Sequence, residues 1–303
     1  MDLLALMRCF VRVAEAASFT AVAEETGSSQ PTISRQIAQL EAHLGARLLL
    51  RSTRQVALTD EGQRFLDRAR TVLDSVAEAE GSVGRKRMRP TGTLRLAMPV
   101  VFGRLHVAPR LSRLLARYPD LALDLVMHDG TTDLIEEGID LAVRIGAVTD
   151  PSLIAKRFGT TRRLTVATPG YLAAHGTPRY PQDLGQHQCI LYTRLSTGPV
   201  WRFSSPTGPL DVTVSGRVRA NNSDGVRAAV LDGHGIAVVP NWMLTDELET
   251  GALVSLLTAF EPERLPMQVV YPSRRYVPLK TSAAIQFFET EFRLDPRFST
   301  TMV

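Results

Sequence analysis

The chain has 303 residues, of which 44% are apolar and 22% are charged, and its net charge is +4. This length and composition predict a soluble globular protein of about two or three domains. The sequence has no long uncharged apolar run, which argues against a transmembrane helix and against the membrane as a partner. Asp2, Arg8 and Arg12 interrupt the apolar residues of the N-terminus. We therefore expect no signal peptide and a cytoplasmic protein.

The two cysteines and six histidines of the chain do not form a metal-binding or disulfide pattern. Cys9 and Cys189 lie far apart, which gives no support to a disulfide or to a CxxC metal site. We expect both cysteines to be small buried apolar residues. The histidines are scattered without metal-ligand spacing, so the sequence predicts no metal and no cofactor.

The first 58 residues have the pattern of three helices followed by a two-stranded wing. Apolar residues at three- and four-residue spacing predict a helix over residues 2–17. Ser18 is placed to N-cap a short second helix, and Ser29 is placed to N-cap a third helix that ends at Gly45. The stretch 47–58 is short, β-prone and basic, so it is interpreted as the two strands of a wing.

The third helix has a polar outer face that suits a DNA groove. At about 100° per residue, Ile33, Ile37 and Leu40 face inward. The outward side chains then supply hydroxyls, an amide and a guanidinium but no acid, and can read the major groove. An ordinary surface helix is also polar outside, but the capped entry, the short preceding helix and the basic wing together favour DNA. The predicted DNA contacts are Gln30, Pro31, Thr32, Ser34 and Arg35 on the helix, and Arg51 and Arg54 at the wing tip. For the two wing arginines, a solvated surface charge is the alternative.

A long helix with a seven-residue repeat occupies residues 59–89. Its apolar side chains alternate spacings of four and three residues over about three heptads, which is typical of a dimerising coiled-coil seam. An apolar stripe packed on the helix's own domain is the alternative. The basic run 85–89 is interpreted as a solvated helix end rather than a DNA contact. The predicted seam consists of Phe65, Ala69, Val72, Val76, Ala79 and Val83.

From Thr93 onward strands and helices alternate, which predicts a mostly parallel sheet covered by helices. The pattern occurs twice, so we expect two α/β lobes of about equal size. The first half has predicted strands at Thr93–Pro99, Leu121–Met127 and Asp140–Ile145, and predicted helices at Phe102–Tyr118 and Thr132–Glu137. The rest includes predicted helices at Asp224–Asp232 and Leu279–Arg293, and predicted strands at Ile236–Val239 and Pro266–Tyr271.

A ligand of such a domain is expected between the lobes, outside the carboxyl ends of the strands. Two predicted helix starts, at Val100 and at Asn221, should point there and offer backbone N–H groups. For the run 221–224, a plain N-cap is an equally good interpretation. A histidine near a strand end is usually structural. The predicted effector-binding residues are Val100, Val101, Phe102, His128, Thr131, Thr193, Asn221, Asn222 and Pro240.

Ordered motifs run along nearly the whole chain. In the first part they are 19–23 (FTAVA), 29–37 (SQPTISRQI), 40–41 (LE), 44–45 (LG), 48–49 (LL), Arg51 and 58–62 (LTDEG). In the rest they are 102–104 (FGR), 117–120 (RYPD), 137–146 (EGIDLAVRIG) and 233–240 (GHGIAVVP). These motifs closely resemble those of the LysR-type transcriptional regulators.

The resemblance implies a multidomain fold. An all-α winged helix-turn-helix (1–58) and a long linker helix (59–89) precede a two-lobed α/β effector domain (90–303) of the periplasmic-binding-protein-like (type II) kind. Lobe I then comprises about 90–161 and 266–303, and lobe II about 162–265. The resemblance also implies binding of double-stranded promoter DNA, modulation by a small organic effector, homodimers and commonly homotetramers.

The effector site departs from a common pattern of that family. Many relatives have Ser or Thr near the start of the first effector-domain helix, where it can hold a carboxylate. This chain has Pro99, Val100 and Val101 instead. The departure favours a more apolar or aromatic effector over a strongly hydrogen-bonded small acid.

Two other classes of function fit the sequence less well. An enzyme is not expected, because GxSxG, P-loop, HExxH and complete GxGxxG motifs are absent. Gly233-His234-Gly235 lacks the last glycine and follows a helix, which is the wrong context for a dinucleotide. A solute-binding protein is opposed by the missing secretory signal and by the first ninety residues.

Overall fold

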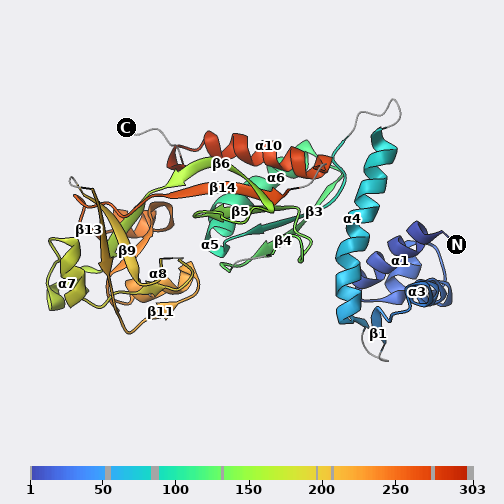
Figure 1. Cartoon of the computed structure of the whole chain (residues 1–303), viewed down its shortest axis with the longest axis horizontal. Coiled ribbons are helices and arrows are strands. Elements are labelled where there is room, and N and C mark those ends of the chain that lie inside the picture. The colour runs from blue at the N-terminus through green and yellow to red at the C-terminus, as the bar shows by residue number, and fades with distance from the viewer. Residues whose placement is uncertain are drawn as a thin grey trace.

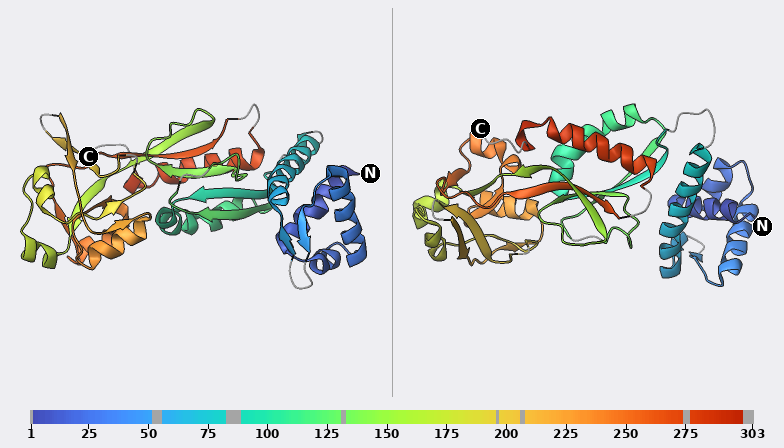
Figure 2. Two further views of the ribbon diagram at one scale, coloured as in Figure 1. Left: turned by 60° about the horizontal axis from the view of Figure 1, so that its bottom comes forward. Right: turned by 45° about the horizontal axis from the view of Figure 1, so that its top comes forward.

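The computed structural model describes residues 2–51, 56–82, 89–130, 133–195, 197–205, 208–273 and 277–298. The molecule is elongated, with a small helical head at one end, a long helix beside it and a two-lobed α/β unit beyond (Figure 1). Figure 2 shows the same order of parts in two further orientations. No helix within the described ranges combines the length and the apolar character that a membrane span requires.

The head contains three helices and a two-stranded wing, as predicted. Its elements are α1 (Leu3–Ala16), α2 (Phe19–Glu25), α3 (Gln30–Leu44), β1 (Leu49–Arg51) and β2 (Val56–Leu58). The predicted serine caps form, since Ser18 accepts the N–H of Ala21 and Ser29 accepts that of Thr32. Gly45 ends α3 in the left-handed conformation, with a φ of +66°. These local signals mark the ends of the helices.

The long helix α4 (Asp60–Ser82) begins on the head and packs against it. The Thr59 hydroxyl accepts the Gly62 N–H at 2.9 Å and donates to the Arg47 carbonyl at 2.7 Å, which ties the helix start to the segment before the wing. Gly62 lies so close to that segment that a Cβ atom would stand 2.0 Å from the Leu48 carbonyl oxygen. Glycine is therefore required at this contact.

Lobe I is built on a five-stranded sheet with the order β4-β3-β5-β14-β6. Its strands are β3 (Gly92–Met98), β4 (Leu121–Met127), β5 (Leu141–Ile145), β6 (Leu153–Thr161) and β14 (Leu265–Pro272). Its helical elements are α5 (Val100–Phe102), η1 (Gly103–Val107), α6 (Ala108–Arg117), α10 (Leu279–Arg293) and η4 (Pro296–Phe298). Helix α10 runs along one face of β14 and β6 (Figure 1). Because β6 leaves the lobe I sheet and β14 returns to it, the chain crosses between the lobes twice.

Lobe II consists of small sheets and short helices. Its strands are β7 (Arg163–Ala167), β8 (Leu191–Tyr192), β9 (Val200–Ser205), β10 (Gly208–Thr213), β11 (Arg219–Ala220), β12 (Ala237–Pro240) and β13 (Val254–Leu256). Its helical elements are α7 (Pro169–His175), η2 (Pro181–Gln186), α8 (Ser223–Leu231), η3 (Asn241–Met243) and α9 (Thr245–Glu249). Its largest sheet has the order β12-β7-β13.

Three expectations about these lobes need correction. Strands β3, β4 and β5 are parallel, but β14 pairs antiparallel with both β5 and β6, and β7 pairs antiparallel with β12 and β13. The predicted helix Thr132–Glu137 does not form over its described part, because residues 134–138 are turns. The predicted helix Phe102–Tyr118 contains a π-helical segment, η1.

Candidate functional site

The outer face of α3 carries the predicted DNA-reading residues. Ile33, Ile37 and Leu40 are buried in the head. Figure 1 shows α3 on the side of the head that is turned away from α4. The predicted residues on the helix, Gln30, Pro31, Thr32 and Arg35, are exposed, and Ser34 is half-buried. The helix therefore presents hydroxyl, amide and guanidinium groups where a duplex could reach them.

The wing is fastened to α3 by a carboxylate. Glu41 accepts the backbone N–H groups of Leu48 at 2.9 Å and of Leu49 at 3.2 Å through the same oxygen, Oε1. This fixes the start of β1 relative to the third helix, a role that the sequence reading missed. The predicted contacts at the wing tip cannot be placed, because Arg54 and the Arg51 side chain lie outside the described residues.

The predicted dimer seam of α4 is divided between two environments. Ala69 is only 1% exposed in the core of the head, and the half-buried Phe65 packs on Phe10 with ring centroids 5.5 Å apart. Val72 is 41% exposed, Ala79 is exposed and Val76 is half-buried. The head itself thus covers the first half of the stripe, which corrects the expectation of one continuous seam. Val83 and most of the basic run 85–89 lie outside the described residues.

Two predicted effector contacts belong to the protein core. Residues Val101 and Phe102 are 1% and 0% exposed. The Phe102 ring packs on His106 of η1 and on Trp242 of lobe II, with centroids 5.1 and 5.4 Å apart. The prediction that these two side chains line a cleft is therefore wrong. Their apolar character serves the packing that joins the lobes.

The other predicted effector residues lie at or near the boundary between the lobes, mostly with structural partners. His128 Nδ1 accepts the Gly130 N–H at 3.1 Å, and Asn222 N-caps α8 by accepting the Gly225 N–H at 2.7 Å. The exposed Thr193 hydroxyl donates to the Ala220 carbonyl. Asn221 is exposed, Pro240 is half-buried at the end of β12, and Thr131 lies outside the described residues.

A residue that was not predicted joins the two helix starts. Asp129 follows β4 in lobe I, and its Oδ1 accepts the N–H of Val100 at 2.8 Å. Its Oδ2 accepts the N–H of Ser223, the first residue of α8 in lobe II, also at 2.8 Å. The predicted helix starts therefore do meet, but their donors converge on a side chain of the protein.

Further polar groups surround Asp129. Burial together with the nearby Asp129 charge raises the pKa of the Tyr192 hydroxyl to about 12. Tyr192 is therefore a neutral hydroxyl at physiological pH. Arg104 of η1 forms an ion pair with Asp224 of α8, with Nη2 and Oδ1 3.6 Å apart, which adds a further polar contact between the lobes.

Two domain families match this sequence. Residues 4–63 match the bacterial regulatory helix-turn-helix protein, lysR family, and residues 87–293 match the LysR substrate binding domain. The chain belongs to the LysR family of transcriptional regulators.

Relatives of this LysR-type regulator match it along nearly their full length. PtxR of Pseudomonas aeruginosa is 36% identical over 287 residues, which are 95% of this chain and 92% of PtxR. DmlR of Escherichia coli is 35% identical over 288 residues, which are 94% of this chain and 93% of DmlR. The solved structure of CrgA from Neisseria meningitidis, at 30% identity and a TM-score of 0.60, covers 95% of this chain and 98% of CrgA.

PtxR and DmlR are described as HTH-type transcriptional regulators, and CrgA is described as a LysR-type transcriptional regulator. This LysR-type regulator is likewise a DNA-binding protein with an effector-binding domain, and it is not an enzyme. Among the residues that the structure describes, no cluster of three or more His, Cys, Asp or Glu side chains could hold a metal ion.

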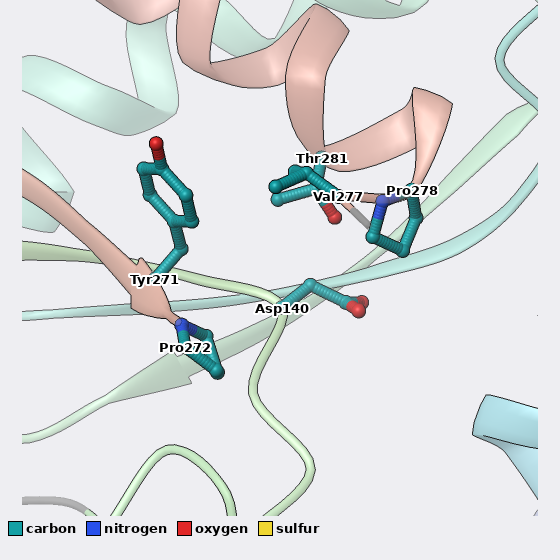
Figure 3. Close-up of a pocket in the computed structure, with 6 residues that line it drawn as sticks. All are labelled: Asp140, Tyr271, Pro272, Val277, Pro278 and Thr281. Atoms are coloured by element: carbon teal, nitrogen blue, oxygen red, sulfur yellow. The ribbon is translucent and has the colours of Figure 1, made fainter. Parts of the chain in front are cut away.

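One cavity of the regulator lies away from the interlobe contact, at the edge of lobe I. Figure 3 shows it between the end of β14 and the start of α10, with Asp140, Tyr271 and Thr281 around it. Its volume is about 10 Å³. That is room for about one water molecule, so this cavity is too small for an organic effector.

The two cysteines of the regulator are free thiols. Cys189 is buried, as predicted, and burial raises its pKa to about 12, whereas Cys9 is half-buried. Cys189 is therefore an inert apolar side chain at neutral pH.

Proposed function

We propose that this LysR-type regulator reads promoter DNA with α3 in the major groove. The observation that carries the proposal is the exposed outer face of α3 opposite its buried isoleucines. Arg35 is placed to pair with a guanine and Gln30 with an adenine, since these side chains match the acceptor and donor pattern of those bases. Pro31, Thr32 and Ser34 then contact thymine methyls, base edges or phosphates, and Arg51 and Arg54 of the wing contact the minor groove or the backbone.

The regulator is proposed to act as a homodimer that assembles further into a homotetramer. Residues 1–58 form the head and 59–89 the linker, and the face of α4 with Val72, Val76 and Ala79 meets the partner helix. Two heads related by a two-fold axis require a pseudo-palindromic site. Because the ligand of such a protein is promoter DNA, its place of action is the bacterial cytoplasm.

The effector is proposed to be a small organic molecule that binds between lobe I (about 90–161 and 266–303) and lobe II (about 162–265). Binding acts through a difference in affinity between two arrangements of the lobes. The residues at this boundary that remain candidates are Val100, through its backbone, His128, Thr131, Thr193, Asn221, Asn222 and Pro240. A change in the lobes then alters the spacing of the DNA-reading heads.

The test of the DNA interface begins with duplexes selected in vitro by the wild-type regulator. Arg35→Ala should weaken binding to the selected duplex by about 1–3 kcal/mol and relax its base preference, as measured by fluorescence anisotropy. The matched control is Arg8→Ala, which removes the same charge from an exposed position of α1. Arg8→Ala should preserve the ratio between the affinity for the selected duplex and the affinity for a scrambled duplex. Equal ratios for Arg35→Ala and the wild type would overturn the assignment of α3.

A further inference from the structure

The two lobes of the effector domain share one carboxylate. Asp129 belongs to lobe I, and its two oxygens accept one backbone N–H from each lobe, Val100 and Ser223, both at 2.8 Å. Ser223 lies 94 residues further along the chain. Each oxygen thus has its own donor, and the half-buried carboxylate spans the boundary between the lobes.

The surroundings of Asp129 suit a negative group. The Tyr192 hydroxyl, which burial and the Asp129 charge keep neutral, lies near it. Arg144 donates to the carbonyl oxygen of the next residue, Gly130, at 3.0 Å, and the Arg104–Asp224 ion pair crosses the boundary beside it. Backbone N–H groups at a helix start favour an anion, and hydrogen bonds to an ionised acceptor are stronger than those between neutral groups. The contact therefore favours a carboxylate at this point.

Capping of α8 does not explain why Asp129 is here. Helix α8 has its own N-cap in Asn222, whose Oδ1 accepts the Gly225 N–H at 2.7 Å. A cap also comes from the residues beside its helix, whereas Asp129 reaches Ser223 from the other lobe. The Asp129–Ser223 hydrogen bond therefore connects the two lobes and is not needed as the N-cap of α8.

We propose that Asp129 is an internal ligand of the sensor, which holds the lobes together and fills the place where an external carboxylate would otherwise bind. The inference rests on the proposed effector site between the lobes. Because both backbone donors already have an acceptor and a second anion would be repelled, the effector is a molecule that puts no anionic group at this position. Asp129 is thus a specificity-determining residue that selects against small organic acids.

Removal of the internal carboxylate should create a receptor for a free one. In Asp129→Ala the N–H groups of Val100 and Ser223 lose their acceptor, and acetate is small enough to replace it. Acetate should therefore raise the Tm of the variant in a saturable way relative to chloride at equal ionic strength. Its affinity, measured by calorimetric titration, should be at least about tenfold higher for the variant than for the wild type.

The matched control is Asp133→Ala in the same lobe. Asp133 also accepts two backbone N–H groups, from Ile135 and Glu136, both at 2.9 Å, but both donors belong to its own turn and the residue is exposed. Acetate should leave the Tm of this control unchanged beyond the effect of salt. The proposal is overturned if acetate does not stabilise Asp129→Ala. It is also overturned if acetate stabilises the wild type and Asp129→Ala equally.

Asp129→Asn provides a second test that does not depend on the alanine variant folding. The asparagine keeps the shape of the side chain, but its NH₂ group faces a backbone donor, so the contact between the lobes should open. Small-angle scattering should give a larger radius of gyration than for Asp133→Asn, and an unchanged profile contradicts the proposal. The Arg35→Ala assay involves neither Asp129 nor acetate, so failure here and failure of the DNA interface are distinguishable.

Discussion

His106 of η1 gives a sharp test of the packing that joins the lobes. The residue is 2% exposed, and neither ring nitrogen finds a hydrogen-bond partner among the described residues. Its ring meets those of Trp242 and Phe298 edge to face, each with centroids 5.0 Å apart. Burial, assisted by the positive charges of Arg297 and Arg110, lowers the pKa of His106 to about 4, although Asp295 acts in the opposite direction.

The size of the effect follows from the two pKa values. An unfolded histidine titrates near 6.5, so between pH 6.5 and pH 4 the unfolded chain binds a proton that the folded chain does not. The free energy of unfolding therefore has its full value above pH 6.5 and decreases as the pH is lowered from 6.5 towards 4. From pH 7.5 to pH 5 the loss due to His106 alone is about 2 kcal/mol. In His106→Leu this contribution disappears, so the variant should gain about 2 kcal/mol relative to the wild type over that interval.

Urea unfolding at both pH values measures the prediction. Trp242 lies against His106, so its fluorescence reports on unfolding at this place. The chain has 2 tryptophans, and replacing the other one, Trp201→Phe, leaves Trp242 as the only indole. Other groups that titrate between these pH values are present in both proteins and largely cancel in the comparison. If the wild type and His106→Leu lose the same stability between pH 7.5 and pH 5, the histidine is not held neutral by burial and the reasoning is refuted.

Three other substitutions test the head, the dimer helix and the joint between head and sensor. Gly62→Ala puts a Cβ 2.0 Å from a backbone oxygen, and should lower the stability of the head by about 1–3 kcal/mol in thermal unfolding. Val76→Asp should weaken dimerisation about tenfold or more in sedimentation experiments, whereas Ser75→Asp, on a neighbouring face of the helix, should not. Asp67→Asn should speed hydrogen exchange in α4, while Asp124→Asn, which changes another partner of the same arginine, should have little effect there.

The head could be predicted closely because its signals are local. The caps at Ser18 and Ser29 and the glycine at Gly45 each act within a few residues, and all three form as expected. The buried and exposed faces of α3 follow from its helical period in the same way. The sequence therefore predicts helix α3 almost residue by residue.

The parts that sequence reasoning missed depend on partners far away in the chain. A seven-residue repeat reveals an apolar stripe on α4, but not that Phe10 covers Phe65 within the head. Strand patterns likewise do not encode direction, so the antiparallel pairing of β14 was not foreseen. The contact between Asp129 and Ser223 joins residues 94 positions apart, and no sequence motif in either segment predicts it.

One strand connects the head to the interlobe contact. Arg95 in β3 forms an ion pair with Asp67 of α4 at 3.1 Å and donates to the carbonyl oxygen of Glu137 at 2.7 Å. The same strand leads directly to Val100, whose N–H binds Asp129, about 16 Å away along the chain at strand spacing. Strand β3 pairs with β4 on one side and with β5 on the other, so Arg95 belongs to the same sheet as the residues that lead to the interlobe contact. The effector modulation proposed above would reach the head through this strand, and by linkage it would be reciprocal.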